Sequence, residues 1–290
     1  NDTIFTGTWI NNTKVIKKLR GKRNSTVKLT ILRPLNNSIF DVIVIRDQIT
    51  TKTIDAFYNV NDTTRYIKIS QFSSSTPLEL KNALNNFNHS NIKKLIIDLR
   101  DNSGGFLDAA IMVADNFLQK NQLIVYTQGR NRKKQEYKAS GNGLYEDKKL
   151  IILINEFTAS AAEIVAGAIQ DNDRGTIVGR RSFGKGLVQE QMQMPDGSAI
   201  RLTIARYYTP SGRCIQNPYS EGTEKYYENF IHRFDNNSFY DTINTQKLPK
   251  YKTIKGRTVY GGGGIMPDIL VPIDTSILNI NIRISDIRQI

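Results

Sequence analysis

Two spacings of apolar residues divide the chain into a short first segment and a longer second one. In the first 46 residues, apolar side chains recur at helical spacing over Thr13–Leu19, which predicts a short helix. Two runs rich in β-branched residues follow, Thr26–Arg33 and Ile39–Arg46, separated by a turn that begins at Pro34. This pattern predicts a β-hairpin after the helix.

From about Gln48 onward, apolar runs typical of buried strands alternate with stretches of helical spacing. Strands are expected at Tyr66–Ser70, Lys94–Leu99, Leu123–Thr127, Leu150–Asn155, Thr176–Gly179, Leu187–Met194 and Ala199–Tyr207, and helices at Pro77–Phe87, Asp108–Leu118 and Ala159–Ile169. Such alternation indicates an α/β fold with a largely parallel sheet. Residues 213–260 are polar and show no clear period, so we expect a surface insertion there.

Composition excludes several classes of protein. The longest aliphatic run, Leu150–Ile154, is far too short to cross a bilayer. A single cysteine, Cys214, excludes an intrachain disulfide framework and any multi-cysteine zinc site. The two histidines, His89 and His232, offer little for a metal site, and we interpret both as exposed bystanders.

The net charge of +13 has two interpretations. A basic surface could bind nucleic acid or an anionic membrane. The alternative is an accumulation of lysine on a solvated face, and we favour it because the chain has no basic amphipathic helix and no basic stripe interleaved with aromatic residues.

One glycine-rich stretch imitates a phosphate-binding loop. Residues 179–185 match the GxxxxGK pattern, but Gly186 stands where the loop needs serine or threonine. A strand follows the stretch, whereas a phosphate loop leads into a helix. Nucleotide binding is therefore excluded, and Lys185 needs another explanation.

Ser160 stands at the junction between an apolar strand and a strongly helical stretch. Backbone N–H groups at such a corner can stabilise an oxyanion, so Ser160 could be a nucleophile. From position alone, however, a serine there is more often a simple helix N-cap, and Thr158 could fill that role as well.

The combination of motifs is more specific than any one of them. The stretch NEFTASAAEIVAGAIQD, then RGTIVG and SFGKGLVQ, resembles the carboxy-terminal processing peptidases, or tail-specific proteases, which are Ser–Lys endopeptidases. IKISQF, DLRDNSGG, ARYYTPSG and GGGIMPDILVP extend this resemblance in the same order over most of residues 48–275.

The resemblance implies a crotonase/ClpP-like α/β peptidase core with a mixed, largely parallel sheet, over residues 48–290 and with the insertion at about 213–260. Residues 1–47 resemble the second half of the α+β PDZ domain that these proteases carry. We therefore expect a partial PDZ domain, unable to fold or bind peptide alone, in a chain that is a fragment of a longer precursor or has lost its upstream part.

The resemblance also assigns roles to residues of this chain. Ser160 matches the nucleophile, Lys185 the general base and Gln189 the partner that orients the lysine. Backbone N–H groups of Gly105 and Ala161 match the oxyanion hole. Lysine is mostly protonated at neutral pH, so this role requires a lowered pKa, which burial near Phe183 and Leu187 would give. On a strand, positions 185 and 189 would share one face.

Two neighbouring positions receive lesser roles. Ser103 stands where relatives often have another glycine, which leaves the oxyanion donor unchanged. Asp171 matches an acidic position that matters in some relatives, and we interpret it as structural, with Arg174 as its expected partner.

The implied substrates are proteins with exposed apolar C-terminal tails, bound as an extra strand beside the active-site sheet. No metal, no organic cofactor and no nucleic acid is implied. The implied location is the bacterial cell envelope or periplasm; peripheral association with the inner membrane and a homo-oligomer stay open. The alternatives are a catalytically silent or latent relative that acts as a scaffold or peptide-binding protein, and a basic protein that binds nucleic acid, whose binding would weaken steeply with salt.

Overall fold

The computed structural model of the chain describes residues 11–48, 51–87, 92–219, 222–231, 233 and 245–272, with only the backbone at 223 and 229. His89 and His232, expected to be bystanders, lie outside these residues. The chain divides into two compact units, Asn1–Thr51 and Lys52–Ile290. Among the described residues, no helix combines the length and the apolar character that crossing a membrane requires.

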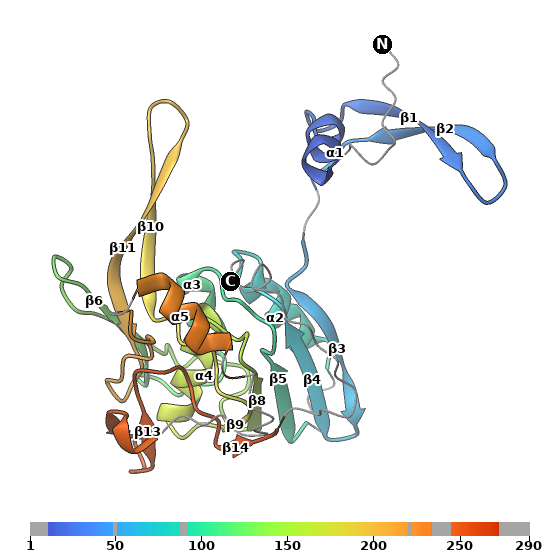
Figure 1. Cartoon of the computed structure of the whole chain (residues 1–290). Helices are drawn as coiled ribbons and strands as arrows, with labels where there is room; N and C mark the ends of the chain where they lie inside the picture. The colour runs from blue at the N-terminus through green and yellow to red at the C-terminus, as the bar shows by residue number, and fades with distance from the viewer. Residues whose placement is uncertain are drawn as a thin grey trace. The chain divides into compact units, whose positions relative to one another are not determined.

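The first unit contains the predicted helix and hairpin (Figure 1). Helix α1 spans Asn12–Leu19, and the Asn11 side chain caps it by accepting a 3.0 Å hydrogen bond from the Lys14 N–H. Strands β1 (Thr26–Arg33) and β2 (Ser38–Ile45) pair antiparallel along their full length. None of residues 11–48 is buried, and the identity of this unit as half a PDZ domain stays a prediction.

The second unit is built on a six-stranded sheet in the order β14-β9-β8-β5-β4-β3 (Figure 1). Its strands are β3 (Ile54–Asn61), β4 (Thr64–Ile69), β5 (Lys94–Asp98), β8 (Lys149–Ile154), β9 (Thr176–Gly179) and β14 (Ile269–Leu270). All neighbours are parallel except β3, which pairs antiparallel with β4. The α/β fold with a mixed, largely parallel sheet is thus confirmed.

Helices α2 (Thr76–Asn85), α3 (Leu107–Asp115) and α4 (Ala161–Asp171) follow strands β4, β5 and β8 of this sheet along the chain. Every residue of α4 is buried, as expected of a helix composed mostly of alanine, valine and isoleucine. The burial includes Glu163, Gln170 and Asp171, whose polar groups therefore require partners.

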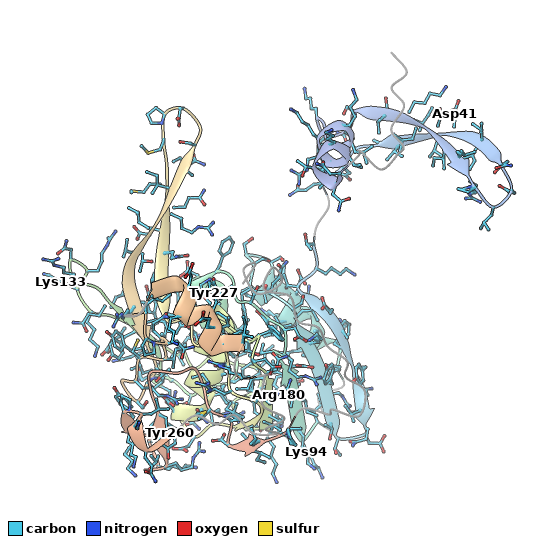
Figure 2. The ribbon with its side chains drawn as sticks, in the orientation of Figure 1. Asp41, Lys94, Lys133, Arg180, Tyr227 and Tyr260 are labelled. Carbon is cyan, nitrogen blue, oxygen red and sulfur yellow. The ribbon has the colours of Figure 1, made fainter. Side chains whose placement is uncertain are left out.

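A second, four-stranded antiparallel sheet has the order β10-β11-β6-β7. Its strands are β6 (Leu123–Gln128), β7 (Gln135–Lys138), β10 (Leu187–Gln193) and β11 (Ala199–Tyr208). Strands β10 and β11 form a long hairpin (Figure 1), and the side chains of its outer part point into solvent on both sides (Figure 2). A β-bulge between Val188 and Gln189 marks the base of this hairpin.

The described part of residues 213–260 is more regular than the sequence predicts. It contains helix α5 (Gly222–Ile231), a 3₁₀ turn at Thr245–Lys247 and the short hairpin β12 (Lys250–Lys252) and β13 (Thr258–Tyr260). Tyr227 on α5 and Tyr260 on β13 mark these elements in Figure 2. Arg213, Tyr226 and Phe230 are buried, so the segment packs into the domain and does not only cover its surface.

Candidate active site

Ser160 lies at a sharp corner between β8 and α4, and its backbone is strained. Its φ of 54° and ψ of −117° form a conformation that residues with a Cβ rarely adopt. All other non-glycine residues with positive φ in the described ranges are asparagine or aspartate. Thr158 holds the turn, because its hydroxyl donates to Leu99 O at 2.8 Å and accepts from Asn155 N at 3.0 Å. Strain of this kind is typical of nucleophiles on strand-to-helix turns.

The loop after β5 brings two glycines against this corner. A Cβ on Gly104 would lie 2.7 Å from Ser160 Cβ, and a Cβ on Gly105 would lie 1.9 Å from Phe72 O. Phe72 N–H donates to Gly104 O at 2.8 Å, and Phe106 N–H donates to Phe72 O at 2.9 Å, which fixes the loop between them. Only glycine, which has no Cβ, allows the backbone to come this close to its neighbours.

The N–H groups of Gly105 and Ala161 have no acceptor among the described residues. Ala161 is the first residue of α4, where an N–H has no partner within its own helix. Unpaired donors at a helix N-terminus favour a developing negative charge. The two groups expected to form an oxyanion hole are thus available for that purpose.

Glu163, buried on the first turn of α4, binds the Ser160 corner to the loop that carries Lys185. Its Oε2 accepts from Ser160 N and from Lys185 N, both at 2.9 Å. Its Oε1 accepts from Gly184 N at 2.8 Å and from the Ser182 hydroxyl. Burial raises the pKa of the Glu163 carboxyl, and its four donors act against that rise. No role was predicted for Glu163; the signal for one was a glutamate three residues after Ser160, which is the spacing of a capping box.

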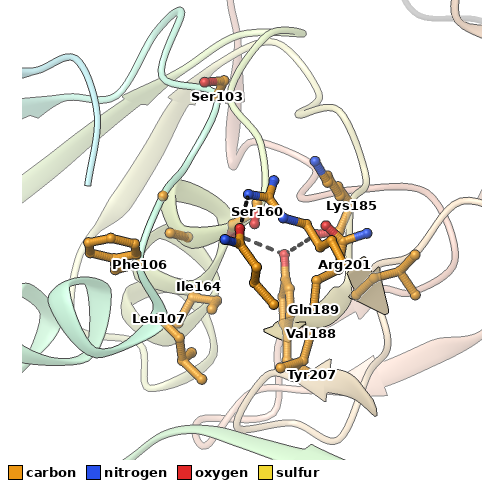
Figure 3. Close-up of a pocket in the computed structure, with 14 residues that line it drawn as sticks. Ser103, Phe106, Leu107, Ser160, Ile164, Lys185, Val188, Gln189, Arg201 and Tyr207 are labelled. Atoms are coloured by element: carbon orange, nitrogen blue, oxygen red, sulfur yellow. Dashed lines mark hydrogen bonds between the residues drawn. The ribbon is translucent and has the colours of Figure 1, made fainter. Parts of the chain in front are cut away.

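The five predicted site residues line one cavity of about 470 Å³ (Figure 3). Its lining consists of Ser103, Gly105, Phe106, Leu107, Ser160, Ala161, Ile164, Lys185, Leu187, Val188, Gln189, Gln191, Arg201 and Tyr207. This set has two basic residues, Lys185 and Arg201, and no acidic one. Arg201 comes from β11 and was not predicted, because no motif of the sequence places it beside position 185.

The pKa of Lys185 is lowered, as a lysine base requires. Burial is the main cause, and the charge of Arg201 adds to it, while Glu163 acts in the opposite direction. At a given pH, a larger fraction of such a lysine is in the neutral amine form than of an exposed lysine. Lys185 is therefore better suited to accept a proton than an exposed lysine is.

The structure differs from the prediction that Lys185 and Gln189 share one face of a strand. Lys185 precedes β10, which begins at Leu187, and the bulge interrupts the alternation of faces before Gln189. Strand alternation therefore does not place Lys185 and Gln189 on one face, although both side chains line the cavity.

Asp171 has a different partner from the one that the sequence suggested. Its Oδ1 lies 2.7 Å from Nη2 of Arg213, and both side chains are fully buried. Arg174 instead donates to the carbonyl oxygens of Phe117 and Tyr145, each at 2.6 Å. Sequence proximity favoured Arg174, whereas the fold brings Arg213 to the end of α4.

Among the described residues, no group of three or more His, Cys, Asp or Glu side chains is arranged so that it could hold a metal ion.

Comparison with known proteins places these features in a family. The model of peptidase family S41 matches residues 63–226, which contain all five predicted site residues. The chain is 40% identical over 195 residues to a carboxyl-terminal-processing protease of Picosynechococcus, covering 67% of this chain and 47% of that protein. It is 39% identical over 208 residues to a carboxy-terminal-processing protease of Bartonella bacilliformis, covering 70% and 47%. The chain thus spans about half the length of these relatives.

Solved structures agree at the level of the fold. The photosystem II D1 C-terminal processing protease aligns with a TM-score of 0.55 at 24% identity, covering 89% of this chain and 58% of that one. An S41 protease of Bacteroides fragilis aligns with a TM-score of 0.52 at 17% identity, covering 72% and 60%.

Proposed function

The chain belongs to peptidase family S41, and we propose that it acts as a serine endopeptidase that cleaves proteins near exposed apolar C-terminal tails. One observation carries the proposal: the same cavity is lined by a strained serine, a lysine of lowered pKa and two backbone donors that have no acceptor in the described part of the chain. Hydrolysis of a peptide bond by a serine nucleophile uses a nucleophile, a base and an oxyanion hole at one site.

In the proposed reaction, Ser160 Oγ attacks the carbonyl carbon of the scissile bond while neutral Lys185 takes its proton. The carbonyl oxygen becomes an oxyanion that accepts from Gly105 N–H and Ala161 N–H. Collapse of this intermediate breaks the C–N bond, and Lys185 returns the proton to the leaving amine. Water then hydrolyses the ester on Ser160, again with Lys185 as the base. Gln189 orients the lysine amine.

The edge of the second sheet supports binding of an extended substrate. In the described part of the chain, β10 pairs with β11 alone, which leaves its other edge open beside the cavity. A peptide can add to such an edge as a further strand, with affinity from main-chain hydrogen bonds and loose sequence demands. Leu107, Ile164 and Val188 give the cavity the apolar lining that apolar tails would contact. The proposed location is the bacterial envelope or periplasm.

The test is cleavage of an unfolded protein that ends in an apolar tail. We expect Ser160→Ala to lower kcat by at least about 10³-fold, because the nucleophile is lost. Lys185→Arg should lose as much, since arginine keeps the charge but cannot be deprotonated. Ser103→Ala is the matched control, because Ser103 lines the same cavity and has no role in the reaction.

Activity unchanged in Ser160→Ala would refute the proposed nucleophile. Binding of the tail by the wild type with no cleavage at any pH would instead favour the silent, peptide-binding alternative.

A further inference from the structure

Tyr207 on β11 is a buried residue of the cavity that no step of the proposed reaction uses. Its side chain is 2% exposed, and its hydroxyl shares its single proton between the backbone carbonyl oxygens of Ser160, at 3.0 Å, and of Lys185 (dashed lines in Figure 3). Its own N–H donates to Gly186 O at 3.0 Å. One tyrosine therefore contacts both segments that carry the proposed nucleophile and base.

Glu163 and Tyr207 contact opposite backbone groups of the same two residues. Glu163 Oε2 accepts from the N–H groups of Ser160 and Lys185, while Tyr207 donates to their carbonyl groups. Both backbone polar groups of each residue thus contact the same two side chains, and Ser160 O also accepts from Glu163 N and Ile164 N of α4. Between residues 155–164 and 181–187, all of which the structure describes, the direct backbone pairing is the bond from Phe183 N to Thr158 O at 2.9 Å.

We propose that Tyr207 is a positioning residue, whose hydroxyl fixes the separation between the backbones of Ser160 and Lys185. This inference rests on the proposed function, because it assigns a role within the same reaction. Proton transfer from serine to lysine depends steeply on their separation, and a displacement of about 1 Å can cost about 100-fold in rate. Burial raises the pKa of the Tyr207 phenol far above its ordinary value, which keeps it protonated and able to donate.

A purely structural role predicts a different outcome from a positioning role. The ring of Tyr207 belongs to the main apolar core, and phenylalanine would fill the same space. If the ring alone mattered, removal of the hydroxyl would leave the reaction unchanged. If the hydroxyl positions the pair, its removal lowers kcat while substrate binding through the β10 edge persists.

The experiment measures kcat and KM of the intact protein carrying Tyr207→Phe. We expect kcat to fall about 10- to 100-fold with KM within about twofold of the wild type. Tyr208→Phe is the matched control, because Tyr208 is the next residue of β11 and stacks on Tyr126 with ring centroids 4.8 Å apart. We expect the control to keep the wild-type kcat.

A second substitution tests the donor itself. p-Aminophenylalanine at position 207 retains the ring and places two N–H donors where the hydroxyl stood, one for each carbonyl. We expect it to restore kcat to within about threefold of the wild type. If Tyr207→Phe does not fold, this substitution decides alone: a loss of more than tenfold in kcat overturns the proposal.

The proposal is also overturned if Tyr207→Phe keeps the wild-type kcat, or if only its KM changes. Failure of the proposed function gives a distinct result, since the wild type would then be inactive or Ser160→Ala would remain active.

Discussion

At the scale of the residue, Ser160 holds a conformation that costs free energy in the folded state. Because glycine adopts positive φ without strain, Ser160→Gly should be more stable than Ser160→Ala by about 1 to 2 kcal/mol. Both variants lack the nucleophile, so activity does not distinguish them. The measurement is the free energy of unfolding in urea for the two variants.

Position 103 provides the control for this comparison. Ser103 lies in the same cavity but is not among the residues of positive φ. Glycine at position 103 relieves no strain, and it raises the conformational entropy of the unfolded chain. Ser103→Gly should therefore be less stable than Ser103→Ala by about 0.5 kcal/mol. The same order of stability at both positions would contradict strain at Ser160.

The pH dependence of the reaction is a second prediction at the scale of the residue. In the proposed reaction Lys185 acts when neutral, so kcat/KM should rise with pH through the pKa of this lysine in the free enzyme. Burial lowers that pKa, and Arg201 lowers it further by charge repulsion. Arg201→Gln removes the repulsion, which raises the pKa and moves the rising limb to higher pH.

Arg206→Gln is the control for this shift, because Arg206 lies on the same strand as Arg201 but does not line the cavity. A pH profile that moves equally in both variants would indicate an effect of net charge on the whole molecule. A profile of Arg201→Gln that moves to lower pH would contradict the assigned sign.

The proposed pair could be predicted from the sequence because Ser160 and Lys185 stand in local motifs. Arg201 and Tyr207 could not be, although both lie in a strand that the sequence predicts, and neither could the contacts of Glu163 with Gly184 and Lys185. Their roles depend on contacts between segments far apart in the chain, and a pattern in one segment does not encode them.

At the scale of the element, strands with a local sequence pattern were predicted, and a strand that depends on contacts with distant segments was missed. Buried parallel strands such as β5 and β8 appear in the sequence as short apolar runs, because strands that are buried on both faces have apolar residues at successive positions. Strand β3 was missed because it lies at the edge of the sheet, and seven of its eight positions are not buried. Its structure follows from pairing with β4, which tertiary context decides.

The buried pair of Asp171 and Arg213 joins the end of α4 to the turn that follows β11. Asp171 also accepts from Ser211 N at 3.1 Å and from the Ser211 hydroxyl at 2.7 Å. Asp171→Ala would leave the Arg213 charge buried without its partner, so we expect a loss of about 3 to 5 kcal/mol in the free energy of unfolding.

Asp147→Ala is the control for the buried pair, because Asp147 is exposed and its contact with Lys148 is a surface ion pair. It should change stability by less than about 1 kcal/mol. Equal effects in the two variants, measured by urea unfolding, would mean that burial does not decide the contribution of Asp171.

At the scale of the whole molecule, the two units differ in what stabilises them. Lys52–Ile290 has an extended apolar core between its sheet and helices, whereas none of residues 11–48 is buried. Large apolar side chains of the first unit, such as Leu35 and Ile39, are exposed. A hairpin and one helix bury too little apolar surface to be stable independently.

Amide hydrogen exchange tests this difference within one sample of the intact chain. Amides of β1 and β2 should exchange close to the rate of an unstructured peptide, because local opening of this hairpin costs little free energy. Amides paired between β5 and β8 should exchange at least about 10³-fold more slowly, since they open only when the core opens. Protection in β1 and β2 equal to that in β5 and β8 would contradict the difference, and would mean that the first unit shares the stability of the peptidase core.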